Sequence, residues 1–161
     1  MTRRLLLTAL VILCTTALAQ EPAPPPVGES APVPPPGATA LLIAHKDAGF
    51  QLPLDKRTYP AIFRGVIQTV PAGHRVLIYL PPAGSPALIE VLDKAVGWSE
   101  SSYMRQSGMI ESTLGRPYFK HLNSSGEVLT AVSGDPGGVG VVSADTLLSP
   151  SVVILWPQGG P

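Results

Sequence analysis

The chain has 161 residues, 11 basic and 11 acidic, so its formal net charge is zero. Only 14% of its residues are charged and no cluster of basic residues is present, which argues against nucleic acid as a partner. It has a single cysteine, Cys14, so a disulfide within the chain and a cysteine-ligated metal site are both excluded.

The first 19 residues have the pattern of a secretory signal peptide. Arg3 and Arg4 give a positive start, residues 5–18 are mostly apolar, and Ala17-Leu18-Ala19 is a small-x-small cleavage site. The apolar run is too short to cross a bilayer comfortably. We therefore expect a periplasmic or secreted protein that has no membrane span after cleavage.

Two alternatives remain for this segment, namely a retained membrane anchor and a lipoprotein modified at Cys14. Lipoprotein processing favours a small residue directly before the cysteine, and Leu13 occupies that position. Cleavage after residue 19 would leave a mature chain without cysteine, which would have to be stabilised by burial alone.

Residues 20–38 are predicted to form a proline-rich linker. Eight of the 18 residues from Glu21 to Ala38 are proline, in clusters at 24–26 and 34–36. Because proline fixes φ and donates no backbone hydrogen bond, an extended polyproline-like segment is expected. Such a segment can be a semi-rigid tether or simply a solvated tail.

The folded part is predicted to start with a short buried strand at Ala40–Ala44. A helix capped by Asp55 should follow and end at Gly65. Pro60 lies near the start of this helix and should bend or shorten it. The β-rich segment Arg75–Leu80 is predicted to be the next strand.

The second helix is expected to begin with Ser85 as its cap and Pro86 in its first position, a favoured combination. Its apolar residues fall at helical spacing and should form one buried stripe: Leu88, Val91, Leu92, Ala95 and Val96. Gly97 should end it.

Ser99 is predicted to cap a short third helix at Glu100–Arg105. Tyr103 and Met104 are expected to point from it toward the core. A loosely structured stretch from Ser107 to Leu122 should follow.

Ser124 or Ser125 is expected to cap a helix that runs through Val132. Residues 135–138, Asp-Pro-Gly-Gly, form a turn signal. The segments Val139–Val142 and Val152–Trp156 are then predicted to be strands. Strands separated by helices predict an α/β domain with a small, largely parallel sheet flanked by helices, over residues 39–157, followed by a frayed tail at 158–161.

Four motifs along this domain resemble those of a known family. They are Ala61–Gly65, Pro71–Gly73, the helix start Gly84-Ser85-Pro86, and the glycine-rich Gly137–Val142. Together they resemble the phosphate-type substrate-binding proteins of bacterial ABC importers, in a short single-lobe form, over most of residues 40–145. The resemblance implies a type 2 periplasmic-binding-protein-like lobe.

The ligand motif of that family departs from the pattern in this chain. The family carries Ser-Gly-Thr at a helix start and an arginine four residues before the serine, where helix N–H groups and a guanidinium hold an anion. Here Ser85 matches the serine, but Pro86, Ala87 and Pro81 replace the glycine, threonine and arginine. The candidate ligand-binding residues are Gly84, Ser85, Ser124 and Ser125.

Neither a metal site nor an active site is indicated. His45, His74 and His121 have no metal-ligand spacing, and no serine lies in a nucleophile elbow. We expect a protein without enzymatic activity, metal or cofactor. Asn123-Ser124-Ser125 matches a glycosylation acceptor but also suits a helix cap, and the cap is favoured.

Two hypotheses follow for function. The first is an exported solute-binding-protein-like domain with a degraded anion site, whose partner is a small anion bound weakly or not at all. The second is a cell-envelope interaction or scaffold domain that binds an envelope protein. The segment Arg116–Lys120, basic and aromatic, is the best candidate contact surface, although such a segment can equally pack on the core.

Overall fold

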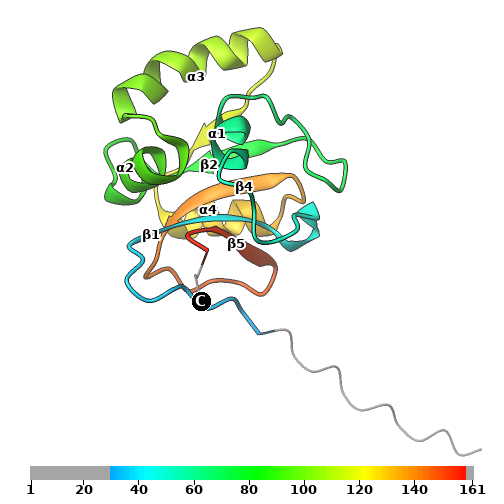
Figure 1. The fold of residues 1–161 in the computed structure, drawn as a ribbon, viewed down its shortest axis with the longest axis vertical. Coiled ribbons are helices and arrows are strands. Elements are labelled where there is room, and N and C mark those ends of the chain that lie inside the picture. Colours follow the sequence, from blue (N-terminus) through cyan, green and yellow to red (C-terminus); the bar gives the residue numbers. More distant parts are fainter. Residues whose placement is uncertain (1–29, 159–161) are drawn as a thin grey trace, which may run out of the picture.

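The computed structural model describes residues 30–158 (Figure 1). The predicted signal peptide, the first part of the predicted linker and all but Gln158 of the predicted tail lie outside these residues. The domain boundaries drawn from the sequence therefore stay predictions.

The core of the fold is a five-stranded sheet with the order β3-β2-β4-β1-β5. The strands are β1 Ala40–His45, β2 Leu77–Leu80, β3 Phe119–His121, β4 Gly138–Ser143 and β5 Val152–Trp156. β2 pairs in parallel with β3 and β4, whereas β1 pairs antiparallel with β4 and β5. One strand, β1, therefore runs against the other four, and the predicted α/β class is confirmed.

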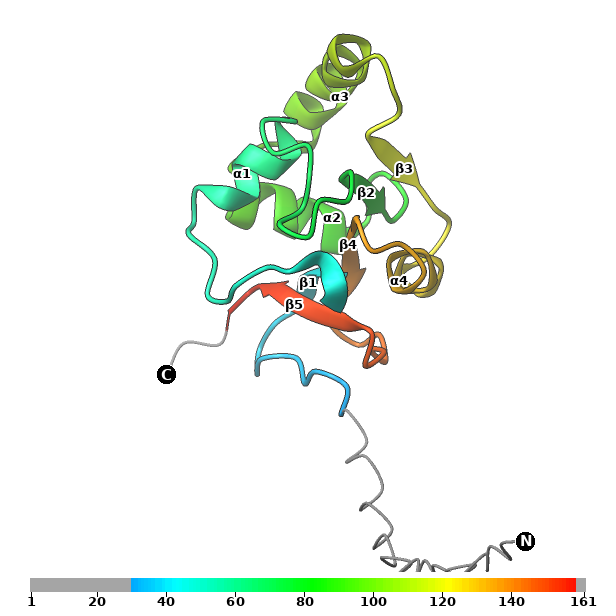
Figure 2. The same ribbon diagram turned by 90° about the vertical axis from the view of Figure 1, so that its right-hand side faces the viewer.

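The helices cover both faces of this sheet. They are the 3₁₀ turn η1 Lys46–Ala48, α1 Thr58–Phe63, α2 Pro86–Val91, the π-helical turn η2 Leu92–Val96, α3 Glu100–Leu114 and α4 Ser125–Ser133. Figure 2 shows α4 on one face, and α1, α2 and α3 on the other.

The inner strand β1, between β4 and β5, is buried along its whole length because both faces are covered. Ala40, Leu42 and Ala44 face the cluster that contains α1 and α2. Leu41 and Ile43 face α4 in a second cluster. A strand covered on both faces needs a continuous apolar sequence, and this explains why residues Ala40–Ala44 are all apolar.

The helix formed by α2 and η2 follows its prediction closely. Its predicted apolar stripe is buried, and Gly97 ends it in the left-handed conformation with φ 76°. Since Pro86 occupies the first helical position, its missing N–H removes no hydrogen bond from the helix.

Helix α1 differs from its prediction at its start. Arg57, not Asp55, is the residue before the helix, and Asp55 Oδ1 accepts a hydrogen bond of 2.7 Å from the Arg57 N–H. Asp55 therefore holds the turn that leads into the helix. Pro60 accompanies a helix of only 6 residues, and Gly65 follows its end with φ 68°, both as expected.

Helix α3 is the main departure from the sequence-based expectation. It continues to Leu114 through residues predicted to be loose. Tyr103 is buried as expected, but Met104 is 57% exposed, so the prediction that it points to the core was wrong. The helix lies outside α1 and α2 (Figure 1) and buries few side chains, so its sequence carries little apolar periodicity.

Helix α4 packs closely on the sheet at Gly140 of β4. A Cβ atom at this glycine would lie 2.6 Å from Val132 Cγ2 and 2.7 Å from Val128 Cγ1. Both distances are far below van der Waals contact, so only glycine allows this separation of helix and strand.

We expect Gly140→Ala to destabilise the protein by about 1–3 kcal/mol, because α4 must move away from β4. Urea denaturation measures this change. The control is Gly108→Ala in α3, where, apart from the neighbouring residues and backbone of the helix itself, no atom lies within 4 Å of the added methyl group. That variant should gain up to about 1 kcal/mol from helix propensity. A Gly140→Ala protein as stable as the wild type would contradict the packing described.

All four tyrosines of the chain are buried. The Tyr59 hydroxyl donates to the Leu155 carbonyl oxygen at 2.9 Å, and the Tyr118 hydroxyl lies 2.7 Å from the carbonyl oxygen of Ile62. Burial raises the pKa of each tyrosine. Together with a hydrogen bond to the Asp135 carboxylate, burial raises the pKa of Tyr79 to about 12.

The raised tyrosine pKa values predict a loss of stability at high pH. Below pH 10 both the folded and the unfolded chain hold these protons, so the free energy of unfolding should not change on their account. Above pH 10 the unfolded chain loses protons that the folded chain keeps, so stability should fall by about 1.4 kcal/mol per pH unit for each tyrosine.

Absorbance at 295 nm measures tyrosinate directly. The native protein should show no titration step near pH 10, and the absorbance should rise only where circular dichroism reports unfolding. A full tyrosine step near pH 10 with the fold intact would contradict this burial.

Candidate functional site

The candidate site lies at the edge of the sheet where the parallel strands end. β2 is followed by α2 on one face, and β3 is followed by α4 on the opposite face (Figure 2). In open α/β sheets, ligands bind at the carboxyl ends of neighbouring strands whose connections leave in opposite directions. All four residues predicted from the sequence lie at this edge, directly after β2 and β3.

The backbone of Gly84 is already engaged by the chain itself. Gly84 has a φ of 76°, and its N–H donates to the Oε1 atom of Glu100, in the first turn of α3. A carboxylate of the protein therefore occupies the N–H group directly before the predicted anion-binding serine.

Ser85 lies at the cap position of α2, as predicted, but its hydroxyl does not cap the helix. Its Oγ atom is covered by surrounding atoms and has no hydrogen-bond partner among the described residues. The expected capping hydrogen bond is therefore absent, and an unsatisfied polar atom remains at the helix start.

Ser124 and Ser125 both have structural partners. Ser124 Oγ accepts from the Glu127 N–H at 3.2 Å and so caps the helix, and Glu127 Oε2 accepts from the N–H of Asn123, one residue before the cap, at 3.0 Å. Ser125 Oγ accepts from the Ser143 N–H at 3.0 Å and so joins α4 to the end of β4. The predicted capping role of this segment is confirmed.

His121 links three elements at the same edge, a contact that sequence reasoning missed. Its Nδ1 lies 3.1 Å from the Pro81 carbonyl oxygen, and its Nε2 lies 2.8 Å from the Tyr103 hydroxyl. With the proton on Nδ1, the imidazole donates to Pro81 and accepts from Tyr103. The only feature that could have pointed to this bridging role of His121 is its position at the end of strand β3.

The histidines do not converge on a metal site. His45 accepts from the Asp47 N–H at 3.1 Å, and His121 lies at the end of β3. Within residues 30–158 no group of three His, Cys, Asp or Glu side chains is placed to hold a metal ion. No helix in that range is long and apolar enough to cross a membrane.

The surface beside α2 carries more negative than positive charge. A cavity of about 610 Å³ there is lined by Pro86, Ile89, Glu90, Asp93, Lys94, Trp98, Ser99 and Glu100. Its one basic side chain, Lys94, pairs with Glu90 at 2.8 Å. The remaining carboxylates disfavour an anion in this part of the surface.

The basic and aromatic segment Arg116–Lys120 packs on the protein's own groups. Tyr118 is fully buried, and the Arg116 guanidinium lies 5.4 Å from its ring centroid and donates to the Val76 carbonyl oxygen at 3.2 Å. Lys120 Nζ lies 6.0 Å from the Tyr79 ring centroid. These contacts give the segment a structural role.

Solved structures share this fold. One from Clostridium perfringens, assigned as a phosphate ABC transporter substrate-binding protein with bound phosphate, has a TM-score of 0.52 at 16% identity. The match covers 73% of this chain and 44% of that chain. This chain therefore spans less than half the length of that receptor. The resemblance drawn from the sequence is confirmed at the level of the fold.

Two further structures show weaker similarity. An ABC-type phosphate transport receptor from Vibrio cholerae has a TM-score of 0.46 at 17% identity, covering 73% of this chain and 45% of that chain. PstS from Borrelia burgdorferi has a TM-score of 0.47 at 13% identity, covering 65% and 40%. No protein-family model and no curated protein matches the sequence.

The different partners of Ser85 and Ser125 predict different effects of removing each hydroxyl. Ser125→Ala should cost about 1 kcal/mol, since the Ser143 N–H loses its acceptor. Ser85→Ala should leave stability unchanged or raise it, because it removes a buried hydroxyl that has no partner. Thermal denaturation compares the two variants. If Ser85→Ala costs as much as Ser125→Ala, the Ser85 hydroxyl has a structural partner after all.

Proposed function

We propose that this chain is an exported, non-enzymatic domain that shares the fold of phosphate-importer receptors but does not bind free phosphate tightly. The observation that carries the proposal is the Glu100 carboxylate on the Gly84 N–H. An anion approaching the start of α2 would have to displace this internal carboxylate, and its charge would be repelled by Glu100 even after displacement.

The groups missing from the helix start act in the same direction. Pro86 has no N–H, Ala87 has no hydroxyl, and Pro81 stands where the resemblance would place an arginine. A hydrogen bond to a charged group contributes roughly 1.5–3 kcal/mol. Losing three such donors would remove on the order of 4 kcal/mol or more, which is about a thousandfold in affinity.

The start of α4 offers no replacement for these groups. Ser124 and Ser125 already accept hydrogen bonds from backbone N–H groups, and the Glu127 carboxylate holds the Asn123 N–H. Carboxylates of the chain therefore occupy N–H groups before both helices at this edge. Export to the periplasm or beyond the cell rests on the signal-peptide pattern of residues 1–19.

A cell-envelope interaction domain is the second candidate. Apolar side chains are exposed on α3 and on the segment after α1, where Val66 is 74%, Met109 68% and Met104 57% exposed. Methionine is common at surfaces that accommodate protein partners. Under this second proposal the fold is kept for its surface, and no small anion is bound.

Isothermal titration with inorganic phosphate tests the main proposal. We expect a dissociation constant weaker than about 1 mM, since the donors needed for tight binding are absent or occupied. The Clostridium perfringens receptor serves as the positive control in the same buffer. Micromolar phosphate binding by this chain would contradict the proposal.

A further inference from the structure

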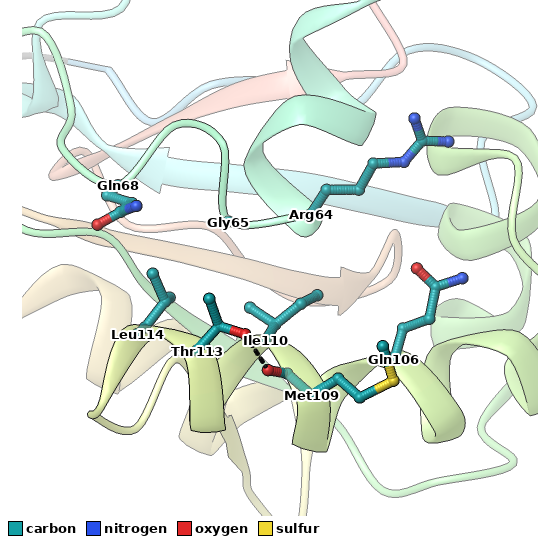
Figure 3. A pocket seen from close by; sticks show the side chains of 8 residues that line it. All are labelled: Arg64, Gly65, Gln68, Gln106, Met109, Ile110, Thr113 and Leu114. Carbon is teal, nitrogen blue, oxygen red and sulfur yellow. Dashed lines mark hydrogen bonds between the residues drawn. The ribbon is translucent and has the colours of Figure 1, made fainter.

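A second concave site lies away from the sheet edge, between α3 and the segment that follows α1. This groove has a volume of about 260 Å³ and is lined by Arg64, Gly65, Gln68, Gln106, Met109, Ile110, Thr113 and Leu114 (Figure 3). None of these residues belongs to the candidate site described above, so the groove is independent of it.

The floor of the groove is formed where Gly65 packs closely against Ile110 and Leu114 of α3. A Cβ atom at Gly65 would lie 2.9 Å from Ile110 Cγ2 and 3.4 Å from Leu114 Cδ1, and Gly65 has a φ of 68°. The Thr113 hydroxyl donates to the Met109 carbonyl oxygen at 2.8 Å, so it is satisfied within α3. The middle of the groove is therefore apolar and held in place by the contact of α3 with Gly65.

Arg64 is the one charged side chain that lines the groove. Its guanidinium lies 5.9 Å from the centroid of the Trp98 ring and pairs with no carboxylate of the described residues. Glu111, on the same helix as the groove wall, is engaged elsewhere, because its Oε1 accepts from the Tyr118 N–H at 2.8 Å and the Phe119 N–H at 2.9 Å. The groove thus carries a positive charge without a counter-charge.

The polar groups lie at the two ends of the groove. Figure 3 shows Arg64 and Gln106 at one end and Gln68 at the other, with Ile110 and Leu114 between them. With a volume of about 260 Å³, the groove is smaller than the roughly 300–1,000 Å³ of pockets that hold drug-sized ligands. The groove therefore suits a small ligand that has one anionic end and an apolar chain.

We propose that this groove binds a short aliphatic monocarboxylate, for which hexanoate serves as the probe. The carboxylate is held by the Arg64 guanidinium and the Gln106 amide, and the alkyl chain lies along Ile110 and Leu114. The charged fork of arginine matches a carboxylate, and the apolar floor excludes a fully hydrated anion such as phosphate.

The methionines of the chain provide a direct test. There are three, Met1, Met104 and Met109, and of the two within residues 30–158 only Met109 lines the groove. In protein labelled with ¹³C at the methionine methyl groups, hexanoate should shift the Met109 signal saturably at millimolar concentration. The Met104 signal, from an exposed residue on the same helix, should stay in place.

Two variants and two other probes complete the test. Arg64→Met should weaken hexanoate binding at least tenfold, whereas Arg105→Met, which removes a charge from α3 outside the groove, should not change it. Hexanol and phosphate should bind at least tenfold more weakly than hexanoate. The proposal is overturned if hexanoate leaves Met109 unchanged, if Met104 shifts equally, or if Arg64→Met binds like the wild type.

Discussion

The structure depends on the burial of two central strands, β1 and β4, between helices on both faces of the sheet. Every residue of β1 is buried, and Gly140 lets α4 approach β4 closely. Within this sheet β2 pairs in parallel with β3, so the starts of α2 and α4 lie at the same edge. In open α/β sheets, ligands bind at the carboxyl ends of the strands.

The chemistry of that edge separates this chain from an anion receptor. Free N–H groups at a helix start attract anions because they are unsatisfied and carry positive partial charge. Here Glu100 engages Gly84, and Glu127 engages Asn123, so side chains of the protein satisfy these donors. Fold and function are therefore distinct conclusions: the comparison establishes the fold, and the occupied donors support the proposed function.

Much of the fold could be predicted because the signals for it are local. Burial on both faces requires the apolar run of β1, and the stripe of α2 and η2 follows the helical period. The predicted range of α3 ended too early, at Arg105 and not at Leu114. Apart from Tyr103, the apolar side chains of this helix are at most partly buried, so its sequence lacks a clear apolar stripe. The length of such a helix depends on tertiary contacts, which cannot be read from a single sequence.

The site was less predictable than the fold. The positions of Gly84, Ser85, Ser124 and Ser125 could be located because capping residues follow strands. Their partners could not, because Glu100 and Ser143 come from other elements, 16 and 18 residues away. His121 was considered only as a metal ligand, and its bridge to Pro81 spans 40 residues.

The most direct measurement is the backbone ¹H,¹⁵N signal of Gly84. If the Glu100 carboxylate holds this N–H, the Gly84 proton signal should move upfield in Glu100→Gln and should not respond to phosphate added to the wild type. A Gly84 signal that ignores Glu100→Gln but moves saturably with phosphate would show a free donor, and would contradict the account of an internally occupied anion site.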